Sequence, residues 1–342
     1  MGNLNYIQLT NNIYILESYR EKYDGLSYVV SQVIEKHKFS KNTSKIGSKK
    51  KVIVAAMPYI YGAMLDKKNT NICYTTFETS QLPQGWVDSL SNNYQACIVP
   101  HTAIKKVFVQ SGISIPIFVV HQGYTRLPRL PHLFEKSFTI GFLGVPQARK
   151  NLHKLFGACK DLIHNGQIPE LKLTIHVATY YDELDHGWFE EMKQADFVTY
   201  SEGKKNEREL GEWYAKLSAY CFPSSGEGWS FTPRESLYLG IPTILSDIPV
   251  HRELINSGYC QPIANQGLEA AVYDHYENGK RRKITYGQWH CIQKKDIQSS
   301  IFDVYQNYSL WKEKAQLATQ WIAQQWKNED CLSKVKKVVN QL

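Results

Sequence analysis

Two features that mark whole classes of protein are missing from this chain. No apolar run approaches the roughly 20 residues that a membrane-spanning helix needs, and the first 13 residues are polar and mixed. The seven cysteines are scattered, odd in number and never spaced as Cys-x-x-Cys. We therefore expect neither a signal peptide nor a zinc or disulfide framework, and we interpret the cysteines as free thiols of a cytoplasmic protein.

Short motifs for metal, nucleoside triphosphate and nucleic acid binding are missing as well. The sequence contains no Asp-x-Asp pair, no His-Glu-x-x-His and no Gly-x4-Gly-Lys loop. Asp182 and Asp185 lie near each other, but their spacing does not fit a metal site. No nucleic-acid recognition motif is present either. We expect no metal ion, no other cofactor and no nucleic acid partner.

The charge balance points to anionic partners. The 342 residues carry a formal net charge of +8, and this length favours two domains. A membrane surface and a diphosphate-bearing substrate both fit the charge, as does a merely solvated basic surface. The densest lysine run, at residues 36–51, also contains Ser, Asn and Gly. It is typical of a solvated loop, and a patch that faces a membrane is the alternative.

Short apolar runs alternate with helical patterns along most of the chain. The expected strands cover residues 52–57, 71–77, 96–99, 115–120, 138–143, 171–177, 219–222 and 243–245. The clearest helical patterns cover residues 103–109, 152–163, 210–217 and 233–239. Strands that alternate with helices form parallel, doubly wound sheets, so we expect an α/β fold.

One interruption of this alternation divides the chain. Residues 122–135 contain a glycine and two prolines, which are typical of a linker. The last segment is helical, with apolar residues on one stripe. We therefore expect a first domain at residues 1–125, a second at residues 126–309, and C-terminal helices at residues 310–342.

The strongest candidate for a binding site follows the expected strand at residues 219–222. Glu227 lies between Gly226 and Gly228, and seven residues separate it from Glu235. Ligands of open parallel sheets bind beyond the carboxyl ends of the strands. Glycines let backbone amides approach a ligand, and a helix N-terminus favours phosphate. The loop therefore suits a polyhydroxylated, charged ligand.

A purely structural role explains the two carboxylates unequally. Thr232, Pro233 and Glu235 fit a capping box with proline at the first helical position, so Glu235 could simply cap its own helix. Glu227 has no evident capping role between two glycines. The local sequence leaves both interpretations of Glu235 open.

The stretch at residues 223–247 resembles a known family signature. Glu227 and Glu235 match the Glu-x7-Glu motif of retaining glycosyltransferase family 4, and Gly240 and Pro242 match the Gly-x-Pro that follows it. The resemblance implies the GT-B fold, in which two Rossmann-like domains face each other and a C-terminal helix crosses back to the first. It assigns the acceptor to the first domain and the nucleotide sugar to the second.

Other segments resemble the same family. Gly144, Arg149 and Lys150 lie in a stretch similar to its diphosphate loop, and Glu78 lies in a stretch similar to its acceptor-side strand end. Residues 119–123 resemble its linker. The chain departs from the family at Val145, where arginine is frequent, and in the first loop, where a glycine pair is reduced to one glycine.

The resemblance implies a role for each matched residue. Glu227 would hold hydroxyl groups of the donor sugar, and Glu235 would bind the ribose. Lys150, with Arg149, would neutralise the diphosphate, although a solvated loop would also explain this pair. Glu78 would orient or deprotonate the acceptor, or form a loop salt bridge. Further donor-binding positions are Gly25, Gly144, Gly226, Gly228, Trp229, Ser230 and Phe231.

The resemblance implies a retaining hexosyltransferase of polysaccharide biosynthesis, and the missing metal motifs favour a metal-independent one. The expected donor is a UDP- or GDP-sugar, and the expected acceptor is a glycan or lipid-linked glycan. The expected location is the cytoplasm, with peripheral membrane contact. Two alternatives remain: a catalytically degenerate GT-B protein that binds a glycan or a partner, and a GT-B nucleotide-sugar epimerase. We expect Glu227→Gln to lower turnover with little loss of stability.

Overall fold

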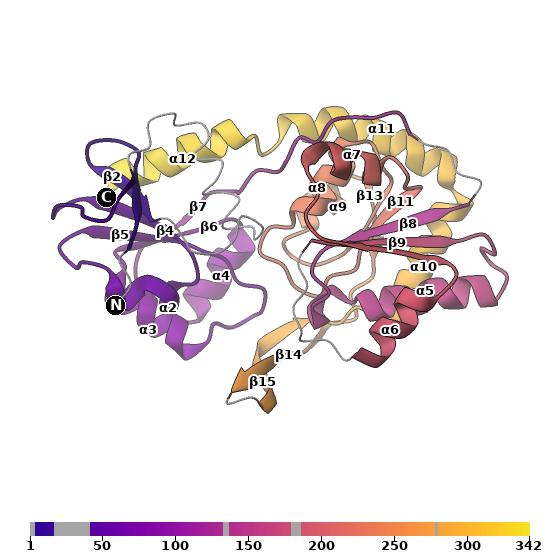
Figure 1. The fold of residues 1–342 in the computed structure, drawn as a ribbon, viewed down its shortest axis with the longest axis horizontal. Coiled ribbons are helices and arrows are strands. Elements are labelled where there is room, and N and C mark those ends of the chain that lie inside the picture. Colours follow the sequence, from indigo (N-terminus) through magenta and orange to yellow (C-terminus); the bar gives the residue numbers. More distant parts are fainter. Residues whose placement is uncertain (1–3, 17–41, 133–136, 179–185, 278–279) are drawn as a thin grey trace. The chain divides into compact units, whose positions relative to one another are not determined.

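The computed structural model describes residues 4–16, 42–132, 137–178, 186–277 and 280–342 (Figure 1). The chain forms two compact units: Met1–Gly123 together with Trp326–Leu342, and Tyr124–Gln325. Gly25 and residues 36–41 of the lysine-rich run lie outside the described residues. No helix in the described part of the chain is long and apolar enough to cross a membrane.

The first unit is built on a seven-stranded sheet in the order β3-β1-β2-β4-β5-β6-β7. Its strands are β1 (Tyr6–Gln8), β2 (Ile13–Leu16), β3 (Asn42–Thr43), β4 (Lys51–Ala55), β5 (Thr70–Tyr74), β6 (Ala96–Val99) and β7 (Ile117–Val119). From β2 to β7 all neighbours are parallel, whereas β1 is antiparallel to both β2 and β3. The predicted parallel sheet is confirmed, and the antiparallel edge is an addition that the sequence pattern did not indicate.

Apolar strands and helices form the core of the first unit. Its helices among the described residues are α2 (Pro58–Tyr61), η1 (Gly62–Met64), α3 (Gln84–Asn93), α4 (Thr102–Gln110) and α12 (Asn328–Gln341). The buried face of α12 presents Cys331, Val335, Val338 and Val339 to the sheet. Lys51 Nζ also donates to the carbonyl oxygen of Val339 at 2.8 Å, near the end of α12. The last helix of the chain therefore belongs to the core of the first unit.

The second unit contains a six-stranded, fully parallel sheet in the order β10-β9-β8-β11-β12-β13. The strands are β8 (Thr139–Leu143), β9 (Lys172–Val177), β10 (Val198–Glu202), β11 (Ala219–Phe222), β12 (Thr243–Ser246) and β13 (Cys260–Ile263). In chain order this is 3-2-1-4-5-6, the Rossmann arrangement. Gly141 on β8 is required sterically, because a Cβ there would lie 2.2 Å from Leu217 Cδ1.

Helices cover both faces of this sheet (Figure 1). On one face lie α5 (Leu152–His164), α6 (His186–Gln194) and α10 (Lys294–Gln306), and on the other α7 (Glu207–Tyr214), α8 (Phe231–Tyr238) and α11 (Tyr308–Gln324). The short α9 (Arg252–Asn256) leads into β13. Gly240 follows α8 with φ 75°, a left-handed conformation that favours glycine and ends a helix. This explains the glycine of the Gly-x-Pro element before β12.

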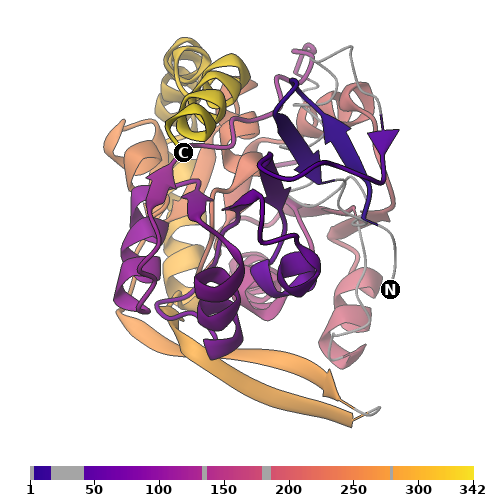
Figure 2. The same ribbon diagram turned by 90° about the vertical axis from the view of Figure 1, so that its left-hand side faces the viewer.

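A two-stranded antiparallel hairpin, β14 (Leu268–Glu277) and β15 (Lys280–His290), forms a sheet of its own. It appears as a separate ribbon in both views (Figure 1, Figure 2). At its base His290 N donates to the carbonyl oxygen of Ser225 at 2.9 Å. The sequence pattern did not indicate this hairpin. Its base is hydrogen-bonded to the loop after β11.

The C-terminal helices divide between the two units. α11 buries Trp311, Ala315, Ala318 and Ile322, the stripe expected from the sequence, and lies in the second unit. The chain then breaks at Trp326, whose φ is 44°, before α12 joins the first unit. Residues 310–325 thus belong to the second compact unit and residues 326–342 to the first.

Candidate functional site

The second sheet has a topological switch point between β8 and β11, where the strand order reverses. Loops that leave such neighbouring strands diverge to opposite faces, and ligands bind in the crevice between them. Residues 144–151 follow β8, and residues 223–230 follow β11. Most of the site residues predicted for the second unit lie in these two loops.

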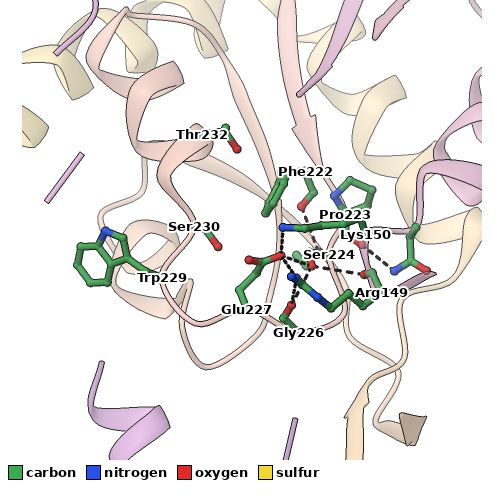
Figure 3. Close-up of polar contacts among 12 residues, drawn as sticks. Arg149, Lys150, Phe222, Pro223, Ser224, Gly226, Glu227, Trp229, Ser230 and Thr232 are labelled. Atoms are coloured by element: carbon green, nitrogen blue, oxygen red, sulfur yellow. Dashed lines mark hydrogen bonds and ion pairs between the residues drawn. The ribbon is translucent and has the colours of Figure 1, made fainter. Parts of the chain in front are cut away.

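A carboxylate and two cations meet between these loops (Figure 3). Glu227 Oε1 accepts hydrogen bonds from Arg149 Nη1 at 2.6 Å and from Lys150 Nζ at 2.5 Å. Arg149 Nη1 also donates to the carbonyl oxygen of Gly226 at 2.8 Å. The side chains of Arg149 and Lys150 are only 11% and 12% exposed, so the pair is a built ionic cluster rather than a solvated loop.

Two polar residues that the sequence analysis missed support this cluster. Ser224 Oγ donates to Glu227 Oε1 at 2.6 Å. Asn151 Nδ2 donates to the carbonyl oxygen of Pro223 at 2.8 Å and to Ser225 Oγ at 2.7 Å, which joins the two loops. Asn151 has φ 54° and precedes α5, and asparagine tolerates this left-handed conformation better than most residues. In the sequence, only the position of Asn151 directly after Lys150 could have indicated that it belongs to the site.

The electrostatics of the cluster keep Glu227 ionised. Burial alone would raise the pKa of the Glu227 carboxyl, but Arg149, Lys150 and the Ser224 hydroxyl outweigh it and lower the pKa to about 2. Three donors share Oε1, and among the described residues no hydrogen bond uses Oε2. Glu227 is therefore a permanent carboxylate with one oxygen left to accept hydrogen bonds from a ligand.

The rest of the loop leads into α8. Gly226 and Gly228 are buried beside Glu227, and Phe231 is the first residue of α8. The helix has neither a side-chain cap at Ser230 nor an acidic residue in its first turn. The N-terminus of a helix favours negative charge. The ring of Trp229 points away from the Glu227 cluster (Figure 3).

Glu235 lies in the second turn of α8 and does not cap it. The helix begins at Phe231, two residues before Pro233, so the proposed capping box does not form. Glu235 is 6% exposed, and Tyr214 Oη donates to its Oε2 across 3.5 Å. Burial raises the pKa of the Glu235 carboxyl to about 7, although hydrogen bonds from Thr125 and Tyr214 oppose the shift. Glu235 is a buried acid that titrates near neutral pH.

We expect Glu235→Gln to stabilise the protein in a pH-dependent manner. The folded carboxyl holds its proton up to about pH 7, whereas the unfolded one loses it near its ordinary value of 4.5. Wild-type stability therefore falls as pH rises through this window, by roughly 3 kcal/mol at about 1.4 kcal/mol per pKa unit. Glutamine does not titrate, so the variant's advantage should grow by that order between about pH 5 and about pH 8 in urea unfolding.

A matched control separates this effect from general acid sensitivity. Glu212 lies on α7 in an exposed pair with Arg208, 3.1 Å from its Nε. Glu212→Gln should change stability by less than about 0.5 kcal/mol at either pH. A constant difference between Glu235→Gln and wild type at both pH values would show that Glu235 is ionised throughout.

The remaining predicted site residues lie elsewhere. Gly144 directly follows β8, and its N–H donates to the carbonyl oxygen of His176 at 3.1 Å. Glu78 lies in the first unit, after β5, and is half-buried. Gly25 lies outside the described residues. Within the residues that the structure describes, no three His, Cys, Asp or Glu side chains are grouped to hold a metal ion.

Comparison with protein families finds a match within the second unit. Residues 127–284 match the model of the family described as glycosyl transferases group 1. This match covers β8 to β13, both loops of the Glu227 cluster and most of the hairpin. Comparison with curated proteins finds no match.

Solved structures share the fold at low sequence identity. TarM of S. aureus superposes with a TM-score of 0.65 and 13% identity, over 92% of this chain and 58% of TarM. HepE of Anabaena superposes with a TM-score of 0.63 and 12% identity, over 85% of this chain and 78% of HepE. The pneumococcal O-GlcNAc transferase GtfA gives 0.60 and 16%, over 92% and 59%. The chain thus spans about three fifths of TarM and of GtfA.

These neighbours are GT-B glycosyltransferases, and the expected fold class is confirmed: two Rossmann-like domains built on parallel sheets. The fold alone covers both units, whereas the sequence match covers only the second. The chain therefore has the GT-B fold, and its residues 127–284 are similar to the group 1 glycosyl transferases.

Proposed function

We propose that this protein is a retaining glycosyltransferase that moves a sugar from a UDP- or GDP-sugar to a glycan or lipid-linked glycan, without a metal ion. The group 1 match and the GT-B neighbours support sugar transfer. HepE was crystallised with UDP-glucose and GtfA with UDP and GlcNAc, which makes a UDP-sugar the first donor to test. The proposed location is cytoplasmic.

The observation that carries the proposal is the cluster of Glu227, Arg149 and Lys150 at the switch point. A nucleotide-sugar donor has a diphosphate that needs cations and a sugar that needs hydrogen-bond acceptors. Arg149 and Lys150 supply the cations, beside the starts of α5 and α8. Glu227 Oε2 supplies the hydrogen-bond acceptor for the sugar. All of these groups lie within the second unit.

The proposed reaction breaks the bond between the anomeric carbon and the diphosphate. Negative charge builds on the leaving phosphate, and preorganised cations and amides stabilise that charge more than they stabilise the bound donor. The acceptor hydroxyl attacks from the same face, and its proton passes to the leaving phosphate. This sequence needs no separate base in the second unit, so the role of Glu78 is to orient the acceptor.

The other donor contacts follow from the geometry of the loop. Trp229 and Ser230 are buried, so they would contribute backbone amides rather than side chains, together with Gly226, Gly228 and Phe231. Glu235 would accept hydrogen bonds from the ribose. Gly144 would let the donor approach the end of β8.

The test begins with nucleotide binding. UDP, GDP and their common sugars are screened by thermal shift, and the stabilising donor is then assayed for transfer to glycan acceptors. Product analysis gives the anomeric configuration, and release of nucleotide without acceptor gives hydrolysis. A chain that binds a donor but neither transfers nor hydrolyses it would be a degenerate binding protein, and a converted nucleotide sugar would indicate an epimerase.

We expect transfer to persist in excess EDTA. The charge on the diphosphate is neutralised in this proposal by Arg149, Lys150 and helix amides, not by a cation. The measurement is the initial rate before and after chelation. Complete loss of activity that magnesium restores would contradict the metal-independent mechanism.

A basic patch on the first unit is the proposed membrane contact. Lys49 N donates to the carbonyl oxygen of Lys68 at 3.1 Å, so the loop before β4 lies beside the loop before β5. The exposed lysines of these loops are Lys45, Lys49, Lys67 and Lys68. Each lysine near an anionic surface adds about 1 kcal/mol of attraction. We therefore expect the protein to co-sediment with liposomes that contain anionic lipid, and not with neutral ones.

Charge reversal provides the matched comparison for that prediction. Lys67→Glu with Lys68→Glu should abolish most co-sedimentation, because the patch loses two cations and gains two anions. Lys105→Glu with Lys106→Glu makes the same change at two exposed lysines of α4, outside the two loops of the patch, and should have little effect. Equal losses in both double variants would point to net charge alone rather than to this patch.

A further inference from the structure

The loop between Glu227 and α8 contains a strained residue. Ser230 has φ 67° and ψ 92°, in the region that residues with a Cβ atom rarely occupy. Conformations of this kind persist only where the surrounding structure holds them, and they cluster at functional sites. Two buried side chains hold Ser230 in this conformation, and neither of them forms a hydrogen bond with Glu227.

The first is His251, in the turn after β12. His251 is fully buried, and its Nδ1 lies 3.0 Å from the carbonyl oxygen of Ser246. A carbonyl only accepts, so Nδ1 carries the proton, and Nε2 must accept a hydrogen bond from Ser230 Oγ at 2.8 Å. Burial lowers the pKa of His251 to about 3, so the imidazole stays neutral and keeps this tautomer. His251 therefore holds the hydroxyl of Ser230.

The second is Arg234, one turn into α8. Its side chain is fully buried, and its Nη1 donates to the carbonyl oxygens of Trp229 and Ser230, the latter at 2.8 Å. The guanidinium carbon also lies 3.6 Å from the centroid of the Trp229 ring. Burial lowers the pKa of Arg234 to about 9, which leaves it charged at neutral pH. Arg234 therefore holds the two peptide groups that flank Ser230.

We propose that His251 and Arg234 are positioning residues that fix the Trp229–Ser230 backbone, and thereby aim the amides of this loop and the carboxylate of Glu227 at the donor. The inference rests on the proposed function. It assigns these buried residues to donor affinity and alignment, rather than to general stability of the core.

Two variants of Ser230 separate backbone positioning from loss of a contact. Ser230→Ala and Ser230→Gly both remove the hydroxyl that binds His251. Alanine disfavours positive φ, whereas glycine adopts it readily. We expect Ser230→Ala to raise the Kd for UDP or GDP, whichever binds the wild type, by roughly tenfold, and Ser230→Gly to stay within about threefold of wild type.

The role of His251 in this contact is tested with His251→Phe, which keeps an aromatic ring but removes the nitrogen that accepts the hydrogen bond from Ser230. Because His251 acts through Ser230, His251→Phe and Ser230→Ala together should weaken nucleotide binding no more than the stronger single variant does. Arg234→Lys keeps the charge but loses the planar fork, so it should also weaken binding. A purely structural role would lower the melting temperature without changing the affinity of the folded protein.

The rate of amide hydrogen exchange at residues 226–231, measured without nucleotide, tests whether His251 and Ser230 restrain the loop when no ligand is bound. Ser230→Ala and His251→Phe should each speed exchange in this loop and leave β8 and β11 unchanged. Unchanged exchange in both variants, or equal nucleotide affinity of Ser230→Ala and Ser230→Gly, overturns the inference. If the loop exchanges as expected but the wild type binds neither UDP nor GDP, the proposed function fails and the positioning of the loop stands.

Discussion

Lys150→Ala should lower the rate of sugar transfer by roughly a hundredfold or more, the scale on which enzymes lose activity when one charge-stabilising group is removed. Lys150 Nζ lies 2.5 Å from Glu227 Oε1 and 4.5 Å from the centroid of the Phe222 ring, and these contacts hold the amine in place. Its charge acts most strongly when negative charge builds on the leaving phosphate. Both kcat and kcat/KM should therefore fall, which steady-state kinetics with the identified donor will measure.

The same substitution at an exposed lysine of α5, the helix that follows Lys150, serves as the control. Lys160 lies near the middle of α5 and is exposed in a pair with Glu191 at 2.7 Å. Lys160→Ala should leave the transfer rate within about twofold of wild type, because exposed pairs contribute little. Lys150→Arg should recover part of the activity, since it restores the charge with a different geometry. Activity of Lys150→Ala within a few-fold of wild type would remove Lys150 from the proposed mechanism.

The fold was predictable where one physical pattern decides it. Buried parallel strands are continuous apolar runs, so the sequence predicts β6 at its observed bounds and α5 to within one residue. The hairpin of β14 and β15 forms a separate two-stranded sheet, so its strands are not the continuous apolar runs of a buried parallel sheet. The sequence also does not indicate that the two units divide at Trp326, because buried apolar residues form a stripe on both α11 and α12.

The sequence predicts which positions belong to the candidate site, but not the hydrogen bonds and ion pairs that connect them. Glycines around Glu227 and the basic pair before α5 indicate a ligand loop, whereas the shared oxygen of Glu227 depends on how two loops meet in space. The contacts of Arg234 and His251 could not be predicted from the sequence, because their partners are backbone carbonyls and a serine brought together by the fold. The capping box for Glu235 failed because α8 begins two residues earlier than its proline suggests.

Glu227→Gln should have two effects, of which the local sequence predicts only the first. The variant loses the carboxylate proposed to hold the donor sugar, so kcat should fall by roughly a hundredfold. It also leaves Arg149 and Lys150 side by side without their shared anion, at positions only 11% and 12% exposed. Removing one partner of a buried ion pair destabilises a protein by roughly 3 kcal/mol or more, so we now expect a clear loss of stability.

Anions should restore that stability, which distinguishes charge imbalance from simple misfolding. In the proposed mechanism a diphosphate contacts the two cations that Glu227 binds, and Glu227→Gln removes the negative charge between them. Pyrophosphate should therefore raise the melting temperature of the variant more than that of the wild type, and added salt should weaken the effect. Glu212→Gln, the same change in the exposed pair with Arg208, should show neither the loss nor the rescue. Normal turnover of Glu227→Gln with the true donor and acceptor would refute the assignment of the sugar-binding loop.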